Sequence, residues 1–530
     1  MELEELSVTE KAAMLSGGSE WDSRGNEKAG IPNFVMSDGP HGVRRQLGEG
    51  DHLGLGSSKP ATCFPTAGTV ASSWDPALAE EMGKALGNEA HDLDVNVLLG
   101  PGLNIKRNPL CGRNFEYYSE DPIVAGRMAA GLIRGIQSNG VSACPKHFAV
   151  NSQELRRQAS NSVVDERTMR EIYLTAFEIA VREAAPMTIM TSYNEINGVY
   201  AHENKHLLQD ILRNEWGFDG MVVSDWGGSN SAVAAVKAGP LSEADLNARA
   251  AEVAKIAHLT KTEGVGRNDL LKDAVAAAHH EIARKVAENS SVLLKNASAT
   301  LPLQSGTRVA VIGDMSKTPR FQGSGSPKVN ATREENILDE LKNAAATTGV
   351  TVAGYAQGYD RQGAKNQTLI DEATTLAAAD TTDAVIVVVG LDERSESEGL
   401  DRSTMAIPQV QNDLVDALTA TGKPVIIVLV GGFLTFLFAE VIAQAVNFFV
   451  QMKWVFKSDS SFKDAAWKYA ILAVVVVVVN LVLPGYVTSL CQGWGMNAGV
   501  AGTIASVVNT LLAVIVSYPL LKFWIMPKNK

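Results

Sequence analysis

Gly220-Met-Val-Val-Ser-Asp225-Trp226-Gly-Gly228 is the stretch that most constrains the fold of this 530-residue chain. Three apolar residues, two of them β-branched, lead through a serine to a carboxylate, an indole and two glycines. A barrel strand that delivers a reactive group at its C-terminal end has this order of residues. The stretch therefore predicts a parallel strand over 221–223 and a functional carboxylate, Asp225, directly after it.

The same order recurs along residues 85–240, where short apolar runs alternate with amphipathic helical stretches. The runs end in polar or turn-forming residues, and they begin at Leu93, Val141, Met187 and Met221. Repeated strand–helix units indicate parallel strands joined by crossover helices, and polar residues at successive strand ends are typical of a barrel active site. We therefore expect residues 1–240 to form a TIM-like (β/α)8 barrel.

Residues 241–302 predict a helical linker, with His279 and His280 serving packing or the surface of an Ala-rich helix. A second α/β segment follows over 303–431. Its runs at 384–390 and 424–430 are almost continuously apolar, as strands buried on both faces of a sheet require. Helical stretches separate its strands near 335–347, 368–379 and 409–420. We expect this segment to be an α/β sandwich domain.

The composition changes after residue 432. Residues 469–521 contain no charged side chain, and a central break divides them into 469–489 and 497–521, each long enough to span a bilayer. The segment 433–452 is apolar as well and is a third candidate span. We therefore expect residues 433–530 to form an all-α transmembrane bundle of two to three helices. The lipid bilayer is then a partner, and a multi-pass location in a bacterial plasma membrane is expected.

Charge is divided unequally between these regions. Seven lysines against three carboxylates give residues 431–530 a charge of +4, so a net charge of −12 for the chain leaves −16 on residues 1–430. An acidic body disfavours nucleic acid as a partner. The four cysteines lack metal-ligand spacing, and no metal or other cofactor is expected. The N-terminus lacks a basic region followed by an apolar core, so no signal peptide is expected. Nothing in the sequence indicates an oligomeric state.

Residues 1 to about 430 resemble glycoside hydrolase family 3, most of all its β-glucosidase branch. Six segments in the family's order carry the resemblance: Ser37-Asp38-Gly-Pro-His-Gly-Val-Arg44, Gly112-Arg113-Asn-Phe-Glu-Tyr-Tyr-Ser-Glu-Asp121-Pro, Lys146-His147-Phe-Ala-Val-Asn, Met190-Thr-Ser-Tyr193-Asn-Glu-Ile-Asn-Gly, Val223-Ser-Asp225-Trp226 and Glu396-Ser-Glu398-Gly-Leu-Asp401-Arg402. The resemblance implies a barrel, a sandwich domain and retaining hydrolysis of a β-glucoside or oligosaccharide from its non-reducing end. Xylosides and other β-linked sugars remain alternatives.

The resemblance also implies roles for individual residues. Asp225 would attack the anomeric carbon, and Glu398 would act as acid and base, with Glu396 as the alternative. Lys146 and His147 would supply positive charge beside Asp225. The substrate-binding residues that the resemblance implies are Asp38, Arg44, Arg113, Lys146, His147, Met190, Tyr193 and Trp226. The stretch Gln322-Gly-Ser-Gly-Ser326 resembles a second loop that lines the pocket, with a flexible turn as the alternative.

The chain departs from the family's pattern in three respects, one of which is that no further β-domain is expected after the second domain. The family continues after Gly239 through an acidic loop and a helical stretch, whereas Pro240 follows here at once, so the loop beside the nucleophile is expected to be short. The second domain stops near Gly431, before the family's usual end, and a truncated sandwich domain with an uncovered strand edge is expected. A catalytically impaired protein that only binds sugar at a membrane is therefore an alternative function.

Residues 433–530 resemble the last three spans of GtrA-like membrane proteins. The stretch Phe448-Phe-Val-Gln-Met-Lys-Trp454-Val-Phe456 carries this resemblance. It implies transport of lipid-linked sugars as a further alternative. A membrane-tethered β-glucosidase-like hydrolase is the leading expectation.

Overall fold

The computed structural model describes residues 3–47, 51, 56–228, 243–260, 271–296 and 299–431. Contacts within the chain separate one unit, Met1–Phe436, from a second, Leu437–Lys530. The expected membrane spans at 433–452, 469–489 and 497–521 lie outside the described residues. Among the residues that are described, no helix is both long and apolar enough to cross a membrane.

Five short parallel strands carry the first half of the described chain, and they are β1 (Met36–Asp38), β2 (Val97–Leu99), β3 (Ser142–Ala143), β5 (Thr188–Thr191) and β8 (Met221–Ser224). The chain just after β3 joins β5, because Met190 donates its N–H to the Pro145 carbonyl at 3.0 Å and Phe148 donates to the Met190 carbonyl at 2.8 Å. The strands run in the direction expected of a barrel. In the described part of the chain the next element after β8 is α8, so the eight strands of the expected barrel are not all present there.

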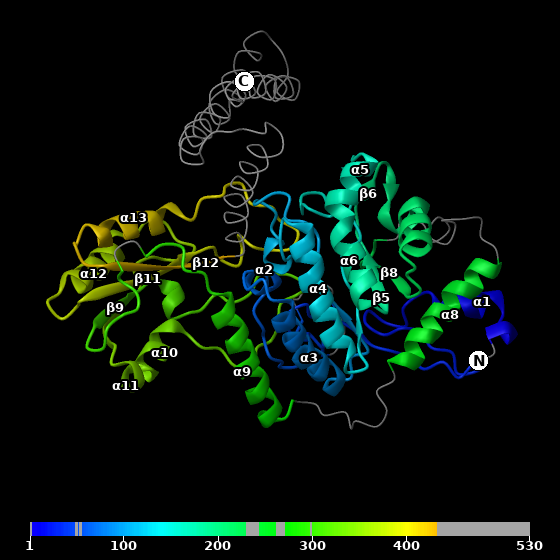
Figure 1. The fold of residues 1–530 in the computed structure, drawn as a ribbon, viewed down its shortest axis with the longest axis horizontal. Helices are drawn as coiled ribbons and strands as arrows, with labels where there is room; N and C mark the ends of the chain where they lie inside the picture. Colours follow the sequence, from blue (N-terminus) through cyan, green and yellow to red (C-terminus); the bar gives the residue numbers. More distant parts are fainter. Residues whose placement is uncertain are drawn as a thin grey trace, which may run out of the picture. The chain divides into compact units, whose positions relative to one another are not determined.

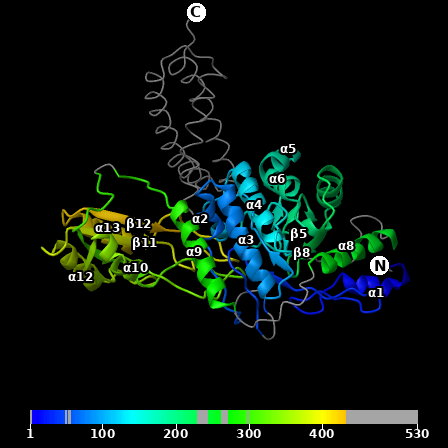
Figure 2. The same ribbon diagram turned by 60° about the horizontal axis from the view of Figure 1, so that its bottom comes forward.

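Three helices pack side by side along the outside of these strands: α3 (Pro76–Asp92), α4 (Pro122–Gln137) and α6 (Thr175–Ala184) (Figure 2). α3 and α4 both begin with an Asp-Pro pair. The Asp75 and Asp121 carboxylates accept hydrogen bonds from two backbone N–H groups each, and the proline occupies the first helical position. A side chain at Gly135 of α4 would collide with the Glu80 carbonyl oxygen, so glycine lets the two helices approach closely.

Helix α8 (Glu243–Leu259) does more than connect two domains. Its residues Ala250 and Ile256 are fully buried in a cluster that also contains Val97, Leu99 and Met221 from the parallel strands. Side chains that point into a barrel normally pack against the strands opposite. Here α8 supplies part of that apolar interior, so the expected linker begins with a helix that belongs to the core.

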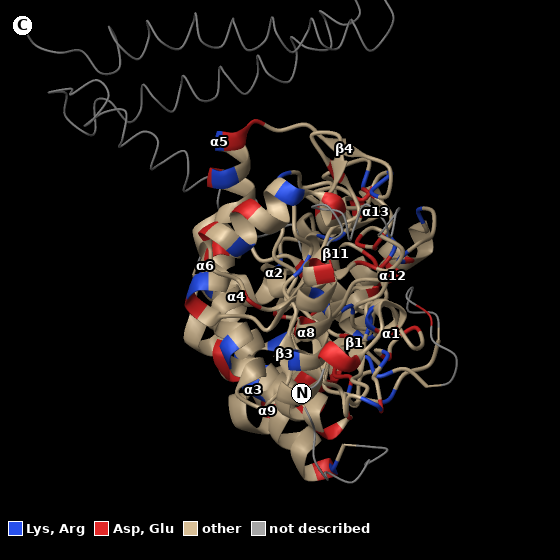
Figure 3. Cartoon of the chain, turned by 90° about the vertical axis from the view of Figure 1, so that its right-hand side faces the viewer, with Lys and Arg blue, Asp and Glu red and all other residues tan. Residues whose placement is uncertain are grey.

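The remaining helices and short strands of this half lie around the same core. They are α1 (Val8–Met14), α2 (Ala67–Ala71), α5 (Glu166–Thr168), α9 (Asp273–Ser290), the π-helical segments Met169–Leu174 and His206–Glu215, and the strands β4 (Asn161–Ser162), β6 (Glu195–Ile196) and β7 (Val199–Tyr200). Blue and red positions lie along α5 and α6 (Figure 3). Ion pairs join Glu166 of α5 to Arg170 of the π-helical segment Met169–Leu174, and Glu178 to Arg182 within α6.

The expected histidine pair lies in α9 and packs as predicted. His279 is buried with its Nδ1 2.8 Å from a carboxylate oxygen of Glu89, and His280 lies 3.0 Å from Glu335. Both contacts are ordinary hydrogen bonds to carboxylates, and they pin α9 to its neighbours.

The second sheet has four parallel strands in the order β10–β9–β11–β12: β10 (Thr351–Ala356), β9 (Arg308–Ile312), β11 (Ala384–Gly390) and β12 (Val425–Val430). Figure 1 shows its helices on both faces. α12 (Gln367–Ala378) and α13 (Gln409–Thr419) share one apolar cluster with the sheet, whereas α10 (Ile337–Asn343), followed by α11 (Ala345–Thr348), contacts the other face. The expected helices and the strands β9, β11 and β12 are therefore confirmed.

Burial differs between the two strands that were expected to be buried on both faces. All seven residues of β11 are buried, whereas β12 is only partly buried and Ile427 is 51% exposed. β12 pairs only with β11 among the described residues and so forms an edge of that sheet. Within residues 303–431 no second strand pairs with β12, and this is why β12 does not have the predicted burial there.

Candidate active site

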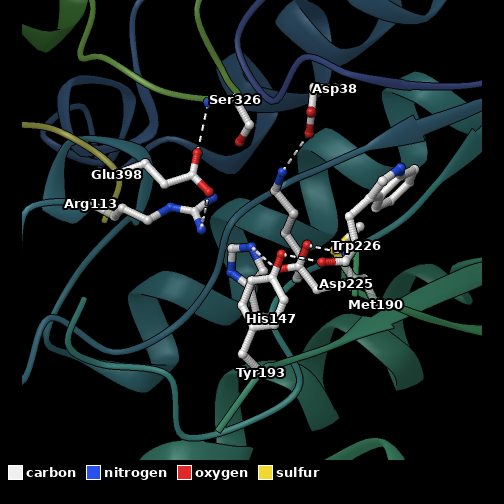
Figure 4. A pocket seen from close by; sticks show the side chains of 10 residues that line it. Asp38, Arg113, His147, Met190, Tyr193, Asp225, Trp226, Ser326 and Glu398 are labelled. Atoms are coloured by element: carbon white, nitrogen blue, oxygen red, sulfur yellow. Dashed lines mark hydrogen bonds and ion pairs between the residues drawn. The ribbon is translucent and has the colours of Figure 1, made fainter. Parts of the chain in front are cut away.

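A pocket opens at the C-terminal ends of the barrel strands (Figure 4). Its walls are formed by Asp38, Arg113, Lys146, His147, Met190, Tyr193, Asp225, Trp226, Ser326 and Glu398. Eight of these come from strand ends or loops of the barrel, and the last two come from loops of the sandwich domain. The structure thus brings together every predicted site residue except Arg44.

Asp225 follows β8 directly and is 9% exposed. Its Oδ1 accepts a hydrogen bond of 2.8 Å from the Trp226 N–H. Burial raises the pKa of Asp225, while Arg113 and the nearby Arg157 oppose that rise. The carboxylate therefore depends on surrounding cations to stay ionised.

His147 does not supply one of those cations. Its Nε2 lies 3.7 Å from Asp225, but burial and the neighbouring Arg113 hold the pKa of His147 well below its ordinary value. A neutral imidazole can hydrogen-bond to a sugar hydroxyl, but it adds no positive charge. Burial of the ring, and after it the charges of Arg113, Lys146 and Arg157, disfavour the protonated form, so the structure does not support the expectation that His147 contributes positive charge.

Lys146 and Arg44 both serve Asp38. The Lys146 ammonium donates a 3.0 Å hydrogen bond to Asp38 Oδ1, and Arg44 lies 3.7 Å from Oδ2. Arg44 also donates to the Ser326 carbonyl at 3.2 Å and is 2% exposed. It thus stands behind Asp38 instead of lining the pocket, so its expected contact with sugar hydroxyls is replaced by a contact with the residue that would make it.

Glu398 reaches the pocket from the loop after β11, where two groups donate hydrogen bonds to it and a third, Arg113, forms an ion pair with it. Its Oε2 accepts from the Ser326 N–H at 2.7 Å, and its Oε1 lies 2.7 Å from Arg157 and 3.5 Å from Arg113. Burial alone would raise the pKa of Glu398, but these two arginines and the Ser326 N–H together hold it well below its ordinary range. As observed, the surroundings favour the ionised carboxylate.

The loop that carries Ser326 is built to approach Glu398. Gly325 has φ +118°, a conformation that favours glycine, and a side chain there would collide with the Glu398 side chain. Ser324 accepts a hydrogen bond of 3.0 Å from the Glu398 N–H, so the two loops also pair through their backbones. The glycine-rich stretch therefore lines the pocket, and the alternative of a free turn is wrong.

Glu396 is turned away from the pocket. Its carboxylate is 2% exposed and forms an ion pair with Arg320, also buried. Although alternate residues of an extended loop can share a face, only Glu398 lines the pocket. The geometry favours Glu398 over Glu396 as the candidate acid and base.

Asp401 fastens the loop of Glu398 to the barrel. Its two carboxylate oxygens accept backbone hydrogen bonds from Gly112 at 3.2 Å, Glu154 at 2.9 Å and Leu155 at 2.9 Å. A side chain at Gly112 would collide with the Leu400 carbonyl oxygen, so the loops touch along their backbones. This contact sets where Glu398 stands relative to the barrel.

Trp226 and Tyr193 form the apolar side of the pocket. The Trp226 indole donates to the Glu20 carbonyl at 2.8 Å and packs on Trp21 with ring centroids 4.9 Å apart. The Tyr193 hydroxyl donates to the Trp226 carbonyl at 2.7 Å. Met190 and Trp226 both adjoin the apolar cluster that contains α8, so the buried helix supports this wall from below.

Sequence reasoning missed three charged residues behind the pocket. Arg157 contacts Glu398, Glu154 contacts Arg157 at 3.0 Å, and Glu116 lies 2.5 Å from Arg113. Glu116 stands within the quoted segment that begins at Gly112, and Arg157 ends a pair of arginines after the Lys146-His147 segment. The sequence could have indicated these residues, because they are ionisable and lie within or shortly after the quoted segments.

Two domain models of one family match the chain. Glycosyl hydrolase family 3 N terminal domain matches residues 4–256, and Glycosyl hydrolase family 3 C-terminal domain matches residues 291–451. The second match includes nearly all of 433–452, which the sequence alone predicts as a membrane span. Neither of these matches reaches residues 452–530, so the GtrA-like resemblance stays a prediction.

The similar curated proteins are named as glycosidases. The chain is 42% identical over 454 residues to thermostable beta-glucosidase B of Acetivibrio thermocellus, an alignment that covers 81% of this chain and 59% of the relative. It is 40% identical over 462 residues to the exo-alpha-(1->6)-L-arabinopyranosidase of Bifidobacterium breve, covering 81% of this chain and 60% of that protein. The chain thus spans about three fifths of the length of each.

Solved structures agree with the fold. The crystal structure of Bifidobacterium adolescentis GH3 beta-glucosidase matches with a TM-score of 0.74 at 40% identity, covering 81% of this chain and 64% of that one. Beta-glucosidase 3B from Thermotoga neapolitana in complex with glucose matches with a TM-score of 0.70 at 29% identity, covering 81% and 68%. These similarities confirm the expected α/β fold of the family.

Proposed function

Because the chain belongs to glycosyl hydrolase family 3 over the residues that both domain models match, we propose that it is a retaining glycosidase. Its substrate would be a β-glucoside, or an oligosaccharide that ends in a related sugar, cut at the non-reducing end. The observation that carries the proposal is that Asp225 and Glu398, from two different domains, line one pocket.

The reaction proceeds in two steps. Asp225 attacks the anomeric carbon while the bond to the leaving oxygen breaks, and that oxygen takes a proton from Glu398. The glycosyl–Asp225 ester is then attacked by water at the same carbon. Glu398 takes the proton from that water, and Asp225 leaves as a carboxylate.

The rest of the pocket binds and orients the sugar. Asp38, held by Lys146, accepts hydrogen bonds from sugar hydroxyls, and the Arg113 guanidinium donates to others. Trp226 and Met190 offer an apolar surface for a sugar face, and the neutral His147 can hydrogen-bond to a hydroxyl. A charged hydroxyl clamp beside an apolar wall fits an uncharged pyranose.

Hydrolysis of a nitrophenyl β-glucoside by the full chain tests this function. We expect turnover by the wild type and a loss of at least about 10⁴-fold in Asp225→Ala, since a chemical step without its nucleophile keeps only binding and electrostatic assistance. Equal activity in both proteins would overturn the proposal. Glucose binding without any turnover would favour the alternative of an impaired sugar-binding protein.

The sugar can be assigned by the same assay. One relative carries the name of a beta-glucosidase and the other that of an exo-alpha-(1->6)-L-arabinopyranosidase. We propose β-glucosides as the preferred class, and nitrophenyl β-xyloside and α-L-arabinopyranoside are the comparison substrates. A higher kcat/KM for the arabinopyranoside than for the glucoside would reassign the substrate.

We further propose that residues 433–530 attach this hydrolase to a membrane, the expected location being a bacterial plasma membrane. The support is the uncharged stretch at 469–521. Full-length chain is expected in the membrane fraction after a carbonate wash, and recovery in the supernatant would contradict the tether. Sugar-lipid movement across vesicles that contain the full chain would support the GtrA-like alternative.

A further inference from the structure

Arg157 bridges two carboxylates behind the pocket wall. Its guanidinium lies 2.7 Å from Glu398 and 3.0 Å from Oε2 of Glu154, and it stacks 4.8 Å above the Tyr193 ring. The aromatic ring fixes the plane of the guanidinium without taking up its hydrogen-bond donors. A small movement of this one group can therefore change how its charge is shared between the two carboxylates.

The buried charges around the pocket do not cancel. Among the described residues that surround it, four cationic side chains, Arg44, Arg113, Lys146 and Arg157, face five largely buried carboxyls, Asp38, Glu116, Glu154, Asp225 and Glu398, and Arg44 also pairs with the partly exposed Asp51. His147 is neutral, because its pKa is held far below its ordinary value by burial and by these cations. An uncompensated buried carboxylate is costly, so one carboxyl of the group is expected to keep a proton near neutral pH.

Two carboxyls of the group, Glu116 and Glu154, are fully buried with one oxygen that accepts no hydrogen bond from the described residues, and of these Glu154 is the one that contacts Arg157. In Glu154 that oxygen is Oε1. Oε2 accepts from Arg157 and from the Gly399 N–H at 2.8 Å. Burial raises the pKa of Glu154 to about 7, against the opposing charges of Arg113 and Arg157.

We propose that Arg157 and Glu154 form a positioning pair that decides whether Glu398 carries a proton. The proposal rests on the proposed function, since it assigns the acid step to Glu398. When Glu154 is neutral, Arg157 forms its ion pair with Glu398, and this pairing keeps Glu398 ionised. With Glu154 ionised, Arg157 pairs with it instead, and Glu398 is released to take up a proton.

The exchange conserves protons and charge. Glu154 releases one proton to solvent, and Glu398 takes one from solvent through the open pocket, so the cluster keeps the same net charge. Glu398 can then protonate the leaving oxygen in the first step. Once that proton has been delivered, Glu398 is again an anion beside Arg157, which suits its role as the base toward water in the second step.

Every charged or titratable group that faces Arg157 enters this balance. Glu398 comes from the sandwich loop, Asp225 from the end of β8, Arg113 from the loop after β2 and Tyr193 from the segment after β5, and both Glu154 and His147 come from the segment after β3. Burial would lower the pKa of Arg157, and the repulsion of Arg113 adds to that, but Glu398, Glu154 and Asp225 together raise it. Arg157 therefore stays charged, and the carboxyls are the groups that titrate.

The kinetic test compares leaving groups. In Glu154→Gln, Arg157 has no second anion, so Glu398 stays clamped and acid catalysis is lost. We expect kcat/KM to fall by at least about tenfold for phenyl β-glucoside, a poor leaving group that needs the acid, and by less than about threefold for dinitrophenyl β-glucoside. In Arg157→Met, Glu398 loses a cation, its pKa rises, and the alkaline limb of kcat/KM moves to higher pH.

Two results would overturn the proposal in this assay. One is an equal loss on both substrates in Glu154→Gln, and the other is an alkaline limb that stays in place in Arg157→Met. Arg157→Lys, which keeps the charge, is expected to restore part of the wild-type limb. Glu166→Gln on the barrel surface is the matched control, since Glu166 is exposed, pairs with Arg170 and His206, and does not line the pocket.

An infrared titration makes the test independent of turnover. A protonated buried carboxyl gives a carbonyl stretch that a carboxylate lacks. We expect the wild type to show such a band at pH 6, Glu154→Gln to lose it, and Glu166→Gln to keep it. If the full chain hydrolyses nothing but the band behaves in this way, the proposed function fails while the assignment of the proton to Glu154 stands. If Glu154→Gln leaves the band unchanged in a folded protein, the positioning pair is wrong whatever the activity.

Discussion

β8 and β12 are both edge strands of their sheets in the described part of the chain. An apolar helix face packs against β8, whereas β12 stays partly exposed. α8 packs Ile256 into the apolar cluster that supports β8, whereas Ile427 of β12 is 51% exposed. In the barrel, helix α8 thus supplies part of the apolar core beneath the strand that carries Asp225. The sandwich domain keeps an open edge and presents Glu398 through one loop, so the two catalytic carboxyls depend on very different supports.

The largest expected effect is a difference in kcat/KM between substitutions of the two glutamates in that loop, Glu398 and Glu396. Glu398→Gln removes the acid and base and is expected to lower kcat/KM for phenyl β-glucoside by about 10²–10⁴-fold. Azide, a small nucleophile, should restore turnover of dinitrophenyl β-glucoside in this variant. The measurement is steady-state hydrolysis together with a thermal melt.

Glu396→Gln is its control, because it leaves Arg320 without a buried partner. This change should lower the melting temperature more than it lowers kcat/KM. The comparison fails if Glu396→Gln abolishes turnover in a protein that melts like the wild type.

The next effect compares two isoleucines. Ile256→Ala on α8 should lower the free energy of unfolding by about 2–5 kcal/mol, because it opens a cavity in a filled core. Ile427→Ala on the exposed edge should change it by less than about 0.5 kcal/mol. Urea unfolding of the full chain measures both, and similar losses would show that α8 is not a core element.

A smaller effect is expected at the loop contact. Asp401→Ala removes a carboxylate that accepts hydrogen bonds from three backbone N–H groups of the barrel. A hydrogen bond to a charged group contributes about 1.5–3 kcal/mol to the free energy of unfolding. Because this contact places Glu398, kcat/KM should fall while Asp225 stays in position. Asp401→Asn keeps one acceptor oxygen, so its kcat/KM should lie between that of the wild type and that of Asp401→Ala. An unchanged kcat/KM in Asp401→Ala would remove this contact from the account.

The smallest effect is a dependence of stability on pH. The pKa of Glu154 is raised to about 7 by burial, so its neutral form belongs to the folded state, and its contribution is full below the unfolded pKa and is lost as pH rises through about 7. The wild type should therefore lose more stability than Glu154→Gln between pH 6 and pH 8. Parallel losses in urea melts at the two pH values would mean that Glu154 is already ionised at pH 6.

Local signals decided what the sequence could predict. The strand before Asp225 and the apolar run of β11 are visible within a few residues, and the structure has both. β10 went unnoticed, because its short run contains Gly354 and its pairing with β9 is interrupted there. The core role of α8 was also hidden, since its helical pattern does not say what its apolar face will meet.

The site divides in the same way. Residues that line the pocket follow strand ends, so their positions could be predicted from the order of the chain. The charge of His147 and the place of Arg44 could not, because both depend on cations and anions that come from distant segments. Arg157 and Glu154 belong to the site only because they lie near Glu398, which is 241 and 244 positions further along the chain.

Covalent trapping tests the central claim most directly. A 2-fluoro glucosyl fluoride reacts with a retaining nucleophile and slows the release of the sugar, so the ester survives digestion. Mass spectrometry of the full chain is expected to find one fluoroglucosyl group, on the peptide that contains Asp225, and none in Asp225→Ala. Turnover of nitrophenyl β-glucoside with no labelled peptide, or with the label on another carboxylate, would contradict the account.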